Sequence, residues 1–299
     1  MTENSGRLGI PAGARRDPAV PGAGTRAGVA RSPALHLGLL LATLLTTTWA
    51  GAFHRGVNLL QEPGNWPVGL PYASALLAIL GLHEMGHYFV AARRGVRVSL
   101  PYFIPVPSYL GTFGAFIRME GPIRDRKAYF DVAVAGPLAG LVPAVIALLI
   151  DLPGSPAGGS HGMVPASSLL LAGIHWLATG SVPDGPLTLG AVAFAGWLGL
   201  IVTALNLMPI GQLDGGHIAY AVFGPRAAEI LGKLIVGVLV LGGLLYSPHL
   251  LMWAALIWFF AGIAHPPAQD ERTPLGPGRK ALALVSFALL LAIVIPWPA

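Results

Sequence analysis

Residues 71–94 read PYASALLAILGLHEMGHYFVAARR, an apolar stretch that ends in histidines and arginines. About 20 apolar residues are enough to cross the hydrocarbon core of a bilayer as one helix. Within this stretch His83 and His87 are four residues apart, so they lie on one helix face and can offer two imidazoles to one metal ion. Glu84 projects from the adjoining face, where a general base acting on a metal-bound water fits better than a third ligand.

The composition is typical of a membrane protein. Hydrophobic residues make up 54% of the 299 residues and charged residues 10%, against about 25% charged residues in soluble domains. The net charge is +5, but the basic residues fall in short loops between apolar runs, which indicates membrane topology and argues against nucleic acid as a partner. The chain has no cysteine, so histidine and carboxylate side chains must supply the ligands of any metal.

The apolar runs predict an α-helical, polytopic membrane protein with about seven transmembrane helices. The predicted spans are 35–53, 71–92, 128–150, 187–205, 227–246, 249–264 and 281–296. Residues 1–34 carry arginines in a Gly/Pro/Ala background and are expected to form a disordered basic tail. We therefore expect the tail 1–34, a six-span core over 35–272, and a linker with the seventh span over 273–299.

The distribution of basic residues predicts the orientation. Arg93, Arg94 and Arg97 follow the second span, which assigns that end to the cytoplasm. Residues 151–186 contain no Lys or Arg, as expected on the opposite side. The topology predicts a multi-pass protein of the cell (inner or plasma) membrane, with the N-terminus in the cytoplasm and HEMGH toward the cytoplasmic side. The apolar segment 165–179 is too short to span and is expected to lie on the bilayer or dip into it.

The segment 95–127 is too polar and too rich in proline to span. Residues 96–100 and 112–120 alternate like strands, and the prolines between them exclude a helix. A small β-hairpin or sheet is therefore predicted on the cytoplasmic side between the second and third spans, with a plain connecting loop as the alternative. An unpaired edge of such a sheet could accept an extended peptide as an additional strand.

The third span contains AGPLAG, in which Gly136 and Gly140 are four residues apart and predict close packing of another helix. Asp131 lies one turn inside the expected start of this span. An acid there is favourable with the helix dipole, so helix capping is the main interpretation and a role in the site is the lesser one.

The stretch NLMPIGQLDGG, residues 206–216, follows the fourth span. Its proline and glycines break the helix at membrane depth, where irregular backbone is tolerated only if it is packed in protein or lines a polar cavity. Asp214 lies in this break, and the expected partner of an acid there is a cation. We therefore expect Asp214 to be the third metal ligand. Weaker candidates are Glu120, Asp125 and Asp131.

These residues suffice for metal-assisted hydrolysis. A catalytic zinc needs three protein ligands and an open position for water. With His83, His87 and Asp214 as ligands, Glu84 would deprotonate the water and pass the proton to the leaving amine. Asn206 is a candidate donor to the oxyanion, although the residues alone favour a polar helix terminator. At membrane depth the most economical substrate is another transmembrane segment, locally unwound.

HEMGH followed by N-x-x-P-x-x-x-L-D-G at residues 206–215 resembles the site-2 protease family of intramembrane metalloproteases, peptidase family M50. Residues 111–140 and the turn HPPAQDE are similar to the branch related to chloroplast and cyanobacterial members, and no insertion is large enough to hold a PDZ domain. The resemblance covers about residues 70–272. It implies one Zn²⁺ per chain, a lipid bilayer as surroundings, a transmembrane protein as substrate, and Asn206 in substrate or oxyanion binding. The expected substrate-binding residues are Gly111, Thr112, Phe113, Gly114, Ala115 and Pro209.

Two other functions use the same ligands. A zinc-binding membrane transporter should carry further polar or ionisable residues at depth in several spans, and the other predicted spans are nearly free of them. A non-catalytic scaffold is disfavoured because every residue that hydrolysis requires is present.

Overall fold

The computed structural model describes residues 32–120, 123–154, 168–262, 270 and 273–297. All elements below belong to the compact unit Pro33–Ala299. Most of the predicted tail 1–34 and of the turn HPPAQDE lies outside the described residues. The helices are α1 (Pro33–His54), α2 (Leu70–Arg93), α3 (Arg126–Asp151), α4 (Leu169–Thr179), α5 (Ala191–Leu207), α6 (Asp214–Phe223), α7 (Pro225–Leu245), α8 (His249–Ala261) and α9 (Pro277–Val294), with 3₁₀ turns at Pro63–Gly69 and Leu152–Gly154.

Helix α2 carries the HEMGH motif, and its ends have local causes. Pro71 occupies the first turn, where the missing N–H of proline costs no helical hydrogen bond. After Arg93 the chain reaches Gly95, whose φ of +74° is readily adopted by glycine and ends the helix. Over 24 residues the helix is about 36 Å long, since each residue adds about 1.5 Å.

Helix α3 begins at a different acid from the one that the sequence suggested. The Asp125 side chain accepts a hydrogen bond from the Ala128 backbone N–H at 2.8 Å, so Asp125 is the N-cap. The prediction of Asp131 as the cap was wrong. Its carboxylate instead forms ion pairs with Arg94 and Arg279. Physically, Asp125 has the extended backbone that a cap requires, whereas Asp131 already lies within the helix.

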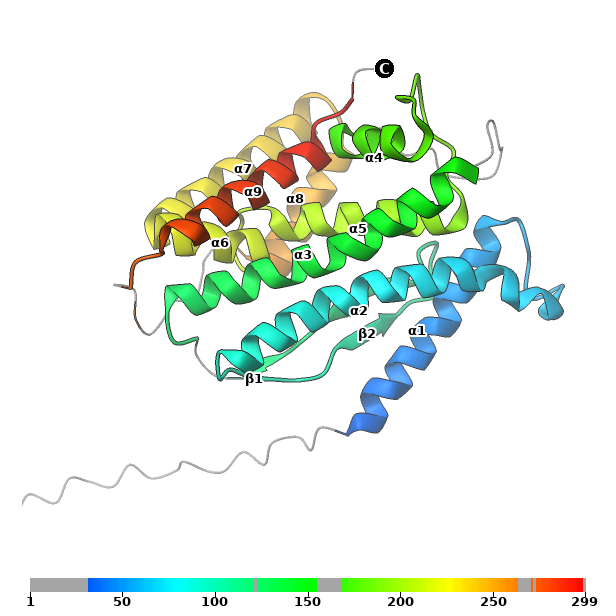
Figure 1. Ribbon diagram of the computed structural model, residues 1–299, viewed down its shortest axis with the longest axis horizontal. Coiled ribbons are helices and arrows are strands. Elements are labelled where there is room, and N and C mark those ends of the chain that lie inside the picture. The colour runs from blue at the N-terminus through cyan, green and yellow to red at the C-terminus, as the bar shows by residue number, and fades with distance from the viewer. Residues whose placement is uncertain (1–31, 121–122, 155–167, 263–269, 271–272, 298–299) are drawn as a thin grey trace, which may run out of the picture. The chain divides into compact units, whose positions relative to one another are not determined.

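The predicted sheet between α2 and α3 is confirmed, and the plain loop is excluded. Strand β1 (Arg97–Val98) pairs antiparallel with β4 (Met119–Glu120). Strand β2 (Tyr102–Pro105) pairs antiparallel with β3 (Thr112–Phe116), with Tyr102 opposite Phe116. The four strands therefore form two two-stranded sheets. Figure 1 shows α1 and α2 on either side of β2, so the β2–β3 sheet lies against both helices.

Small residues bring α2, α3 and α5 close together. A Cβ on Gly86 would lie 2.5 Å from the Ala135 carbonyl oxygen, and a Cβ on Gly196 would lie 2.7 Å from that of Ala144. Only glycine permits such a backbone approach. Around these contacts lies a buried apolar cluster that includes Ile79, Leu148 and Leu200. Figure 1 shows α2 and α3 running side by side, and this pair carries much of the site described below.

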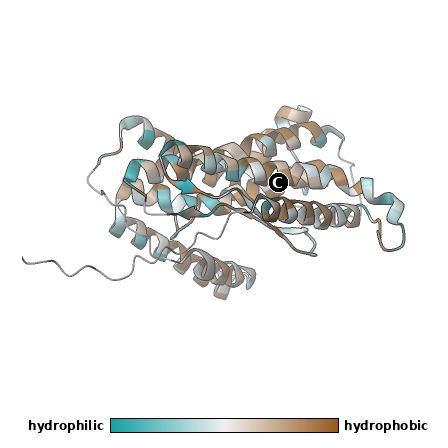
Figure 2. Cartoon of the chain, turned by 90° about the horizontal axis from the view of Figure 1, so that it is seen from below, coloured by the Kyte–Doolittle hydropathy of each residue, from teal (hydrophilic) through white to brown (hydrophobic). Residues whose placement is uncertain are grey.

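Five described helical segments are long and apolar enough to cross a membrane, namely Pro33–His54, Pro63–Arg93, Arg126–Gly154, Pro225–Leu245 and Pro277–Val294. Figure 2 shows hydrophobic residues along the helices and hydrophilic residues gathered toward their ends. The predicted count of seven spans is not confirmed, because α5 has 17 residues and α8 has 13. Helix α4, within the short segment expected at the bilayer surface, has 11 residues.

Candidate metal centre

The two histidines of HEMGH are buried and converge as their spacing predicts. The Nε2 atoms of His83 and His87 are 3.2 Å apart, and the rings meet edge to face with centroids 5.0 Å apart. Both side chains lie on the face of α2 that packs against α3, and less than a tenth of each residue is exposed.

Asp214 completes the cluster from the other end of the chain. It is the first residue of α6, where the positive end of the helix dipole favours a carboxylate. The two glycines after it allow a tight turn, because a Cβ on Gly215 would lie 1.9 Å from the Leu207 carbonyl oxygen. The turn brings Asp214 Oδ2 to 3.5 Å from His83 Nε2 and 3.2 Å from His87 Nε2. The structure thus brings together the three predicted ligands, with ligand atoms all within 4.8 Å of one another.

The spacing of these atoms fits a tetrahedral zinc site. Zinc bonds to imidazole nitrogen and carboxylate oxygen are about 2.0–2.2 Å long, so the edges of the tetrahedron are about 3.3–3.6 Å. The three observed separations are 3.2, 3.2 and 3.5 Å. Two neutral imidazoles and one carboxylate are a common donor set for catalytic zinc, and they leave the fourth position open.

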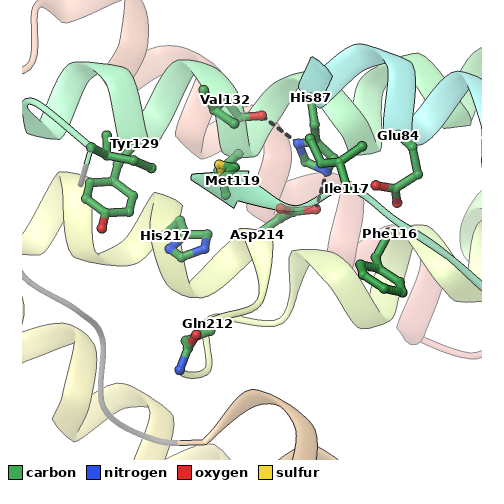
Figure 3. A pocket seen from close by; sticks show the side chains of 12 residues that line it. Glu84, His87, Phe116, Ile117, Met119, Tyr129, Val132, Gln212, Asp214 and His217 are labelled. Carbon is green, nitrogen blue, oxygen red and sulfur yellow. Dashed lines mark hydrogen bonds and ion pairs between the residues drawn. The ribbon is translucent and has the colours of Figure 1, made fainter. Parts of the chain in front are cut away.

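The backbone of α3 fixes the orientation of one ligand. His87 Nδ1 lies 2.8 Å from the Val132 carbonyl oxygen. Because a carbonyl only accepts, Nδ1 carries the proton and Nε2 presents its lone pair toward His83 and Asp214. The hydrogen bond to Val132 thus determines which nitrogen of His87 is available to a metal. Figure 3 shows the contacts of His87 with Val132 and with Asp214 as dashed lines.

The glycines of AGPLAG make room for the imidazoles. A Cβ on Gly136 would lie 2.0 Å from His87 Nε2, and a Cβ on Gly140 would lie 3.0 Å from His83 Cβ. Close helix packing was predicted from this pair of glycines. The structure adds that the space they leave is filled by the side chains of His83 and His87, two of the predicted metal ligands.

A pocket of about 200 Å³ opens beside the cluster. Its lining residues are Glu84, His87, Phe116, Ile117, Met119, Ile123, Tyr129, Val132, Ala133, Gln212, Asp214 and His217. In Figure 3, Glu84 lies on one side of Asp214 and His217 on the other. The Glu84 carboxylate lines the pocket together with Ile117 and does not belong to the group of three ligand atoms. Its position next to the cluster, inside the same pocket, suits a base rather than a ligand.

The pocket meets the sheet slightly later in the chain than expected. Phe116, Ile117 and Met119 line it, whereas the predicted substrate-binding residues 111–115 do not. Those residues form the turn and most of β3. The Gly111 carbonyl accepts a hydrogen bond from Thr46 Oγ1 of α1 at 2.6 Å, and Phe113 is 74% exposed.

Two further predicted residues lie outside the lining of this pocket. Asn206 is half-buried in the last turn of α5, and Pro209 is buried in the turn before α6.

Conversely, Tyr129, Gln212 and His217 line the pocket but were not predicted from the sequence. His217 carried a usable signal, because it follows Asp214 by three residues and therefore shares its face of the helix. The rings of His217 and Tyr129 lie with centroids 5.3 Å apart.

Residues 71–245 match peptidase family M50. The chain belongs to this family. The match includes both halves of the metal cluster, HEMGH on α2 and Asp214 on α6, and it confirms the resemblance to site-2 proteases that those motifs carried.

Among curated proteins, this M50 member is similar to plant chloroplast proteins. It is 33% identical to "Probable zinc metalloprotease EGY2, chloroplastic" of Arabidopsis thaliana over 236 residues, covering 77% of this chain and 42% of the relative. It is 34% identical to "Probable zinc metalloprotease EGY1, chloroplastic" of Oryza sativa subsp. japonica, covering 76% and 40%. The chain therefore spans about two fifths of the length of these relatives. No solved structure matches the chain.

Proposed function

We propose that this protein is an intramembrane zinc metalloprotease that hydrolyses peptide bonds within or near transmembrane segments of membrane-anchored proteins. The main support for this proposal is that His83, His87 and Asp214 converge next to the pocket that Glu84 lines. The names of the plant relatives support the assignment of zinc and of proteolysis. The five long apolar helices support a place in the bilayer.

The chain's residues divide the work of hydrolysis. A bound Zn²⁺ would polarise the scissile carbonyl and lower the pKa of a water to about 7. Glu84 is placed to accept a proton from water in the pocket and to deliver it to the leaving nitrogen. Val132 holds the proton of His87 on Nδ1, so that Nε2 stays available. We assign Asn206 to substrate or oxyanion binding, as the family resemblance implies.

The open edge of β3 supports an extended mode of substrate binding. In the described part of the chain β3 pairs only with β2, so no strand pairs with its other edge. The chain continues from β3 directly into the pocket through Phe116 and Ile117. A locally unwound peptide added along Thr112–Phe116 would therefore reach Glu84 with its backbone already extended. Residues 111–115 then present the substrate without lining the pocket.

We further propose the orientation that the basic residues predict. In it the N-terminus and the metal centre lie toward the cytoplasmic side of the cell membrane. Six spans over a core of 35–272 and a seventh span in the segment 273–299 complete this topology, with α5 and α8 as short crossing helices.

The test compares purified wild-type protein with Glu84→Gln in detergent, measuring zinc content and cleavage of a reporter with a single transmembrane segment. Glu229→Gln is the matched control, because Glu229 forms an exposed ion pair with Lys233 on α7, away from the pocket. We expect all three proteins to hold zinc and only Glu84→Gln to lose cleavage. Equal cleavage by Glu84→Gln would refute the role of Glu84. Zinc flux into proteoliposomes without cleavage would favour the transporter, and zinc binding with neither activity would favour the scaffold.

A further inference from the structure

Asp131 of α3 joins three helices through charged side chains. Its carboxylate receives two hydrogen bonds from Arg279 of α9, from Nε at 2.7 Å and from Nη2 at 2.9 Å. It also forms an ion pair with Arg94, the residue that follows α2. Only about a fifth of the Asp131 side chain is exposed, so these contacts are less screened by solvent than ordinary surface pairs.

The neighbouring residue contacts the metal cluster. Val132 directly follows Asp131, and its carbonyl oxygen accepts the hydrogen bond from His87 Nδ1 at 2.8 Å. One turn of α3 therefore makes two contacts with the α2 segment, through a side chain to Arg94 and through a carbonyl to His87. The ion pair between Asp131 and Arg94 therefore restrains the position of the hydrogen bond between Val132 and His87.

These contacts belong to a continuous seam in which α2 and α3 run in opposite directions. Gly140 faces His83, and Gly136 faces His87. Further along, Asp131 meets Arg94. Because the imidazoles fill spaces that only glycine leaves, a small slide of α2 along α3 would press both rings against side chains or backbone. The ion pair at the end of the seam opposes such a slide.

Helix α9 takes part in the same arrangement, although it lies beyond the matched family region 71–245. Arg279 lies in its first turn. Ala283, one turn later, is buried in an apolar cluster with Phe130 of α3 and Ile218 of α6. Asp131 thus connects the helix that carries the two histidines with a helix packed against the one that carries Asp214.

We propose that Asp131 is a positioning residue of the metal centre. Its carboxylate, bridging Arg94 and Arg279, holds α2 and α3 in the register at which the Val132 carbonyl orients His87 and Gly136 leaves room for its ring. The proposal rests on the proposed zinc site. It goes beyond that site by assigning a role to an acid that is neither ligand nor helix cap, and to a helix outside the matched region.

The test measures zinc affinity by competition with a chromophoric chelator, together with the visible spectrum of the Co²⁺-substituted protein, which reports ligand geometry. The variants are Asp131→Asn and the charge-preserving Asp131→Glu, with Glu229→Gln as the control for loss of an ion pair elsewhere. Loss of a partner that orients a metal ligand costs about 10–100-fold in affinity. We expect Asp131→Asn to weaken zinc binding about tenfold and to alter the Co²⁺ spectrum. Asp131→Glu should recover part of the affinity, and the control should match the wild type.

The outcomes separate this inference from the proposed function. A wild-type protein that binds no zinc refutes the metal centre, and the inference with it. If the wild type and Asp131→Asn bind zinc equally tightly, the inference is refuted while the metal centre stands. This holds even if the variant melts at a lower temperature. If Asp131→Asn does not fold, Arg279→Gln takes its place, because it keeps the carboxylate and its contact with Arg94. An unchanged affinity in that variant also overturns the proposal.

Discussion

Replacing Gly136 by alanine should remove one metal ligand while leaving the helix intact. The added Cβ would lie 2.0 Å from His87 Nε2 and 2.4 Å from its Cε1. Ordinary van der Waals contact begins at 3.4 Å, so the ring must retreat by 1.4 Å, the difference between these two distances. The ring is buried, and its Nδ1 is held by the Val132 carbonyl at 2.8 Å. The retreat therefore breaks that hydrogen bond or moves α2 away from α3.

The expected loss of zinc affinity follows from how little the ligand distances of a metal site can change. Ligand atoms in a working site keep their distances within about 0.2 Å. A retreat of 1.4 Å is far larger and takes Nε2 out of reach of an ion shared with His83 and Asp214. Losing an outer-shell partner alone costs about 10–100-fold in affinity. Losing the ligand should raise the zinc dissociation constant by about 100-fold or more, which corresponds to about 2.8 kcal/mol.

The assay is zinc binding by chelator competition, with Gly237→Ala as the matched control. Gly237 lies within α7, and nothing lies within 4 Å of the Cβ that alanine would add. Alanine favours a helix over glycine by about 1 kcal/mol, so both variants should fold, and circular dichroism checks that they do. Gly136→Ala should lose zinc and Gly237→Ala should keep it. If Gly136→Ala folds and binds zinc like the wild type, then Gly136 does not face the ligand as described, and the assigned packing of α3 on the cluster is wrong.

Three further predictions concern other parts of the site. Glu84→Gln should reduce cleavage of a transmembrane reporter by about 10²–10⁴-fold without loss of zinc, which parallel turnover and metal analyses would check. Removing zinc with 1,10-phenanthroline should abolish cleavage, and added Zn²⁺ should restore it; activity that survives full removal would contradict a metal mechanism. Arg126 donates from Nε to the Ala221 carbonyl at 3.0 Å, at the end of the helix that Asp214 begins. Arg126→Ala should therefore lower the free energy of unfolding by about 1–3 kcal/mol, measurable as a lower melting temperature, while Arg226→Ala serves as an exposed-arginine control.

The metal cluster could be predicted because its information is local. The four-residue spacing of His83 and His87 requires only a helix, and the DGG turn requires only that the backbone break where glycines permit it. Two short motifs thus predicted the three side chains that the structure brings together and the glutamate in the pocket beside them. The small sheet was also predictable, since prolines at 101 and 105 exclude a helix between two alternating stretches.

The features that could not be predicted depend on tertiary contacts. Asp125 and Asp131 are both acids near the start of one helix, and only the backbone conformation shows which of them caps it. The space that Gly136 leaves for a ligand depends on which residue of α2 faces it. The part of the sheet that reaches the pocket depends on the register between β2 and β3, which the sequence pattern leaves open by several residues.

The three predicted metal ligands come from segments that are far apart along the chain. Between His87 and Asp214 the described part of the chain runs through strands β1 to β4 and helices α3, α4 and α5 before it returns. An ion held by both residues would therefore close a very long loop, and the stabilisation that such a clip gives, which increases with loop length, would be lost whenever the ion leaves. Binding to the folded chain alone adds stability that grows with the free zinc concentration. The supply of zinc in the cell would then set how much of this protein persists in its folded form, independently of any substrate.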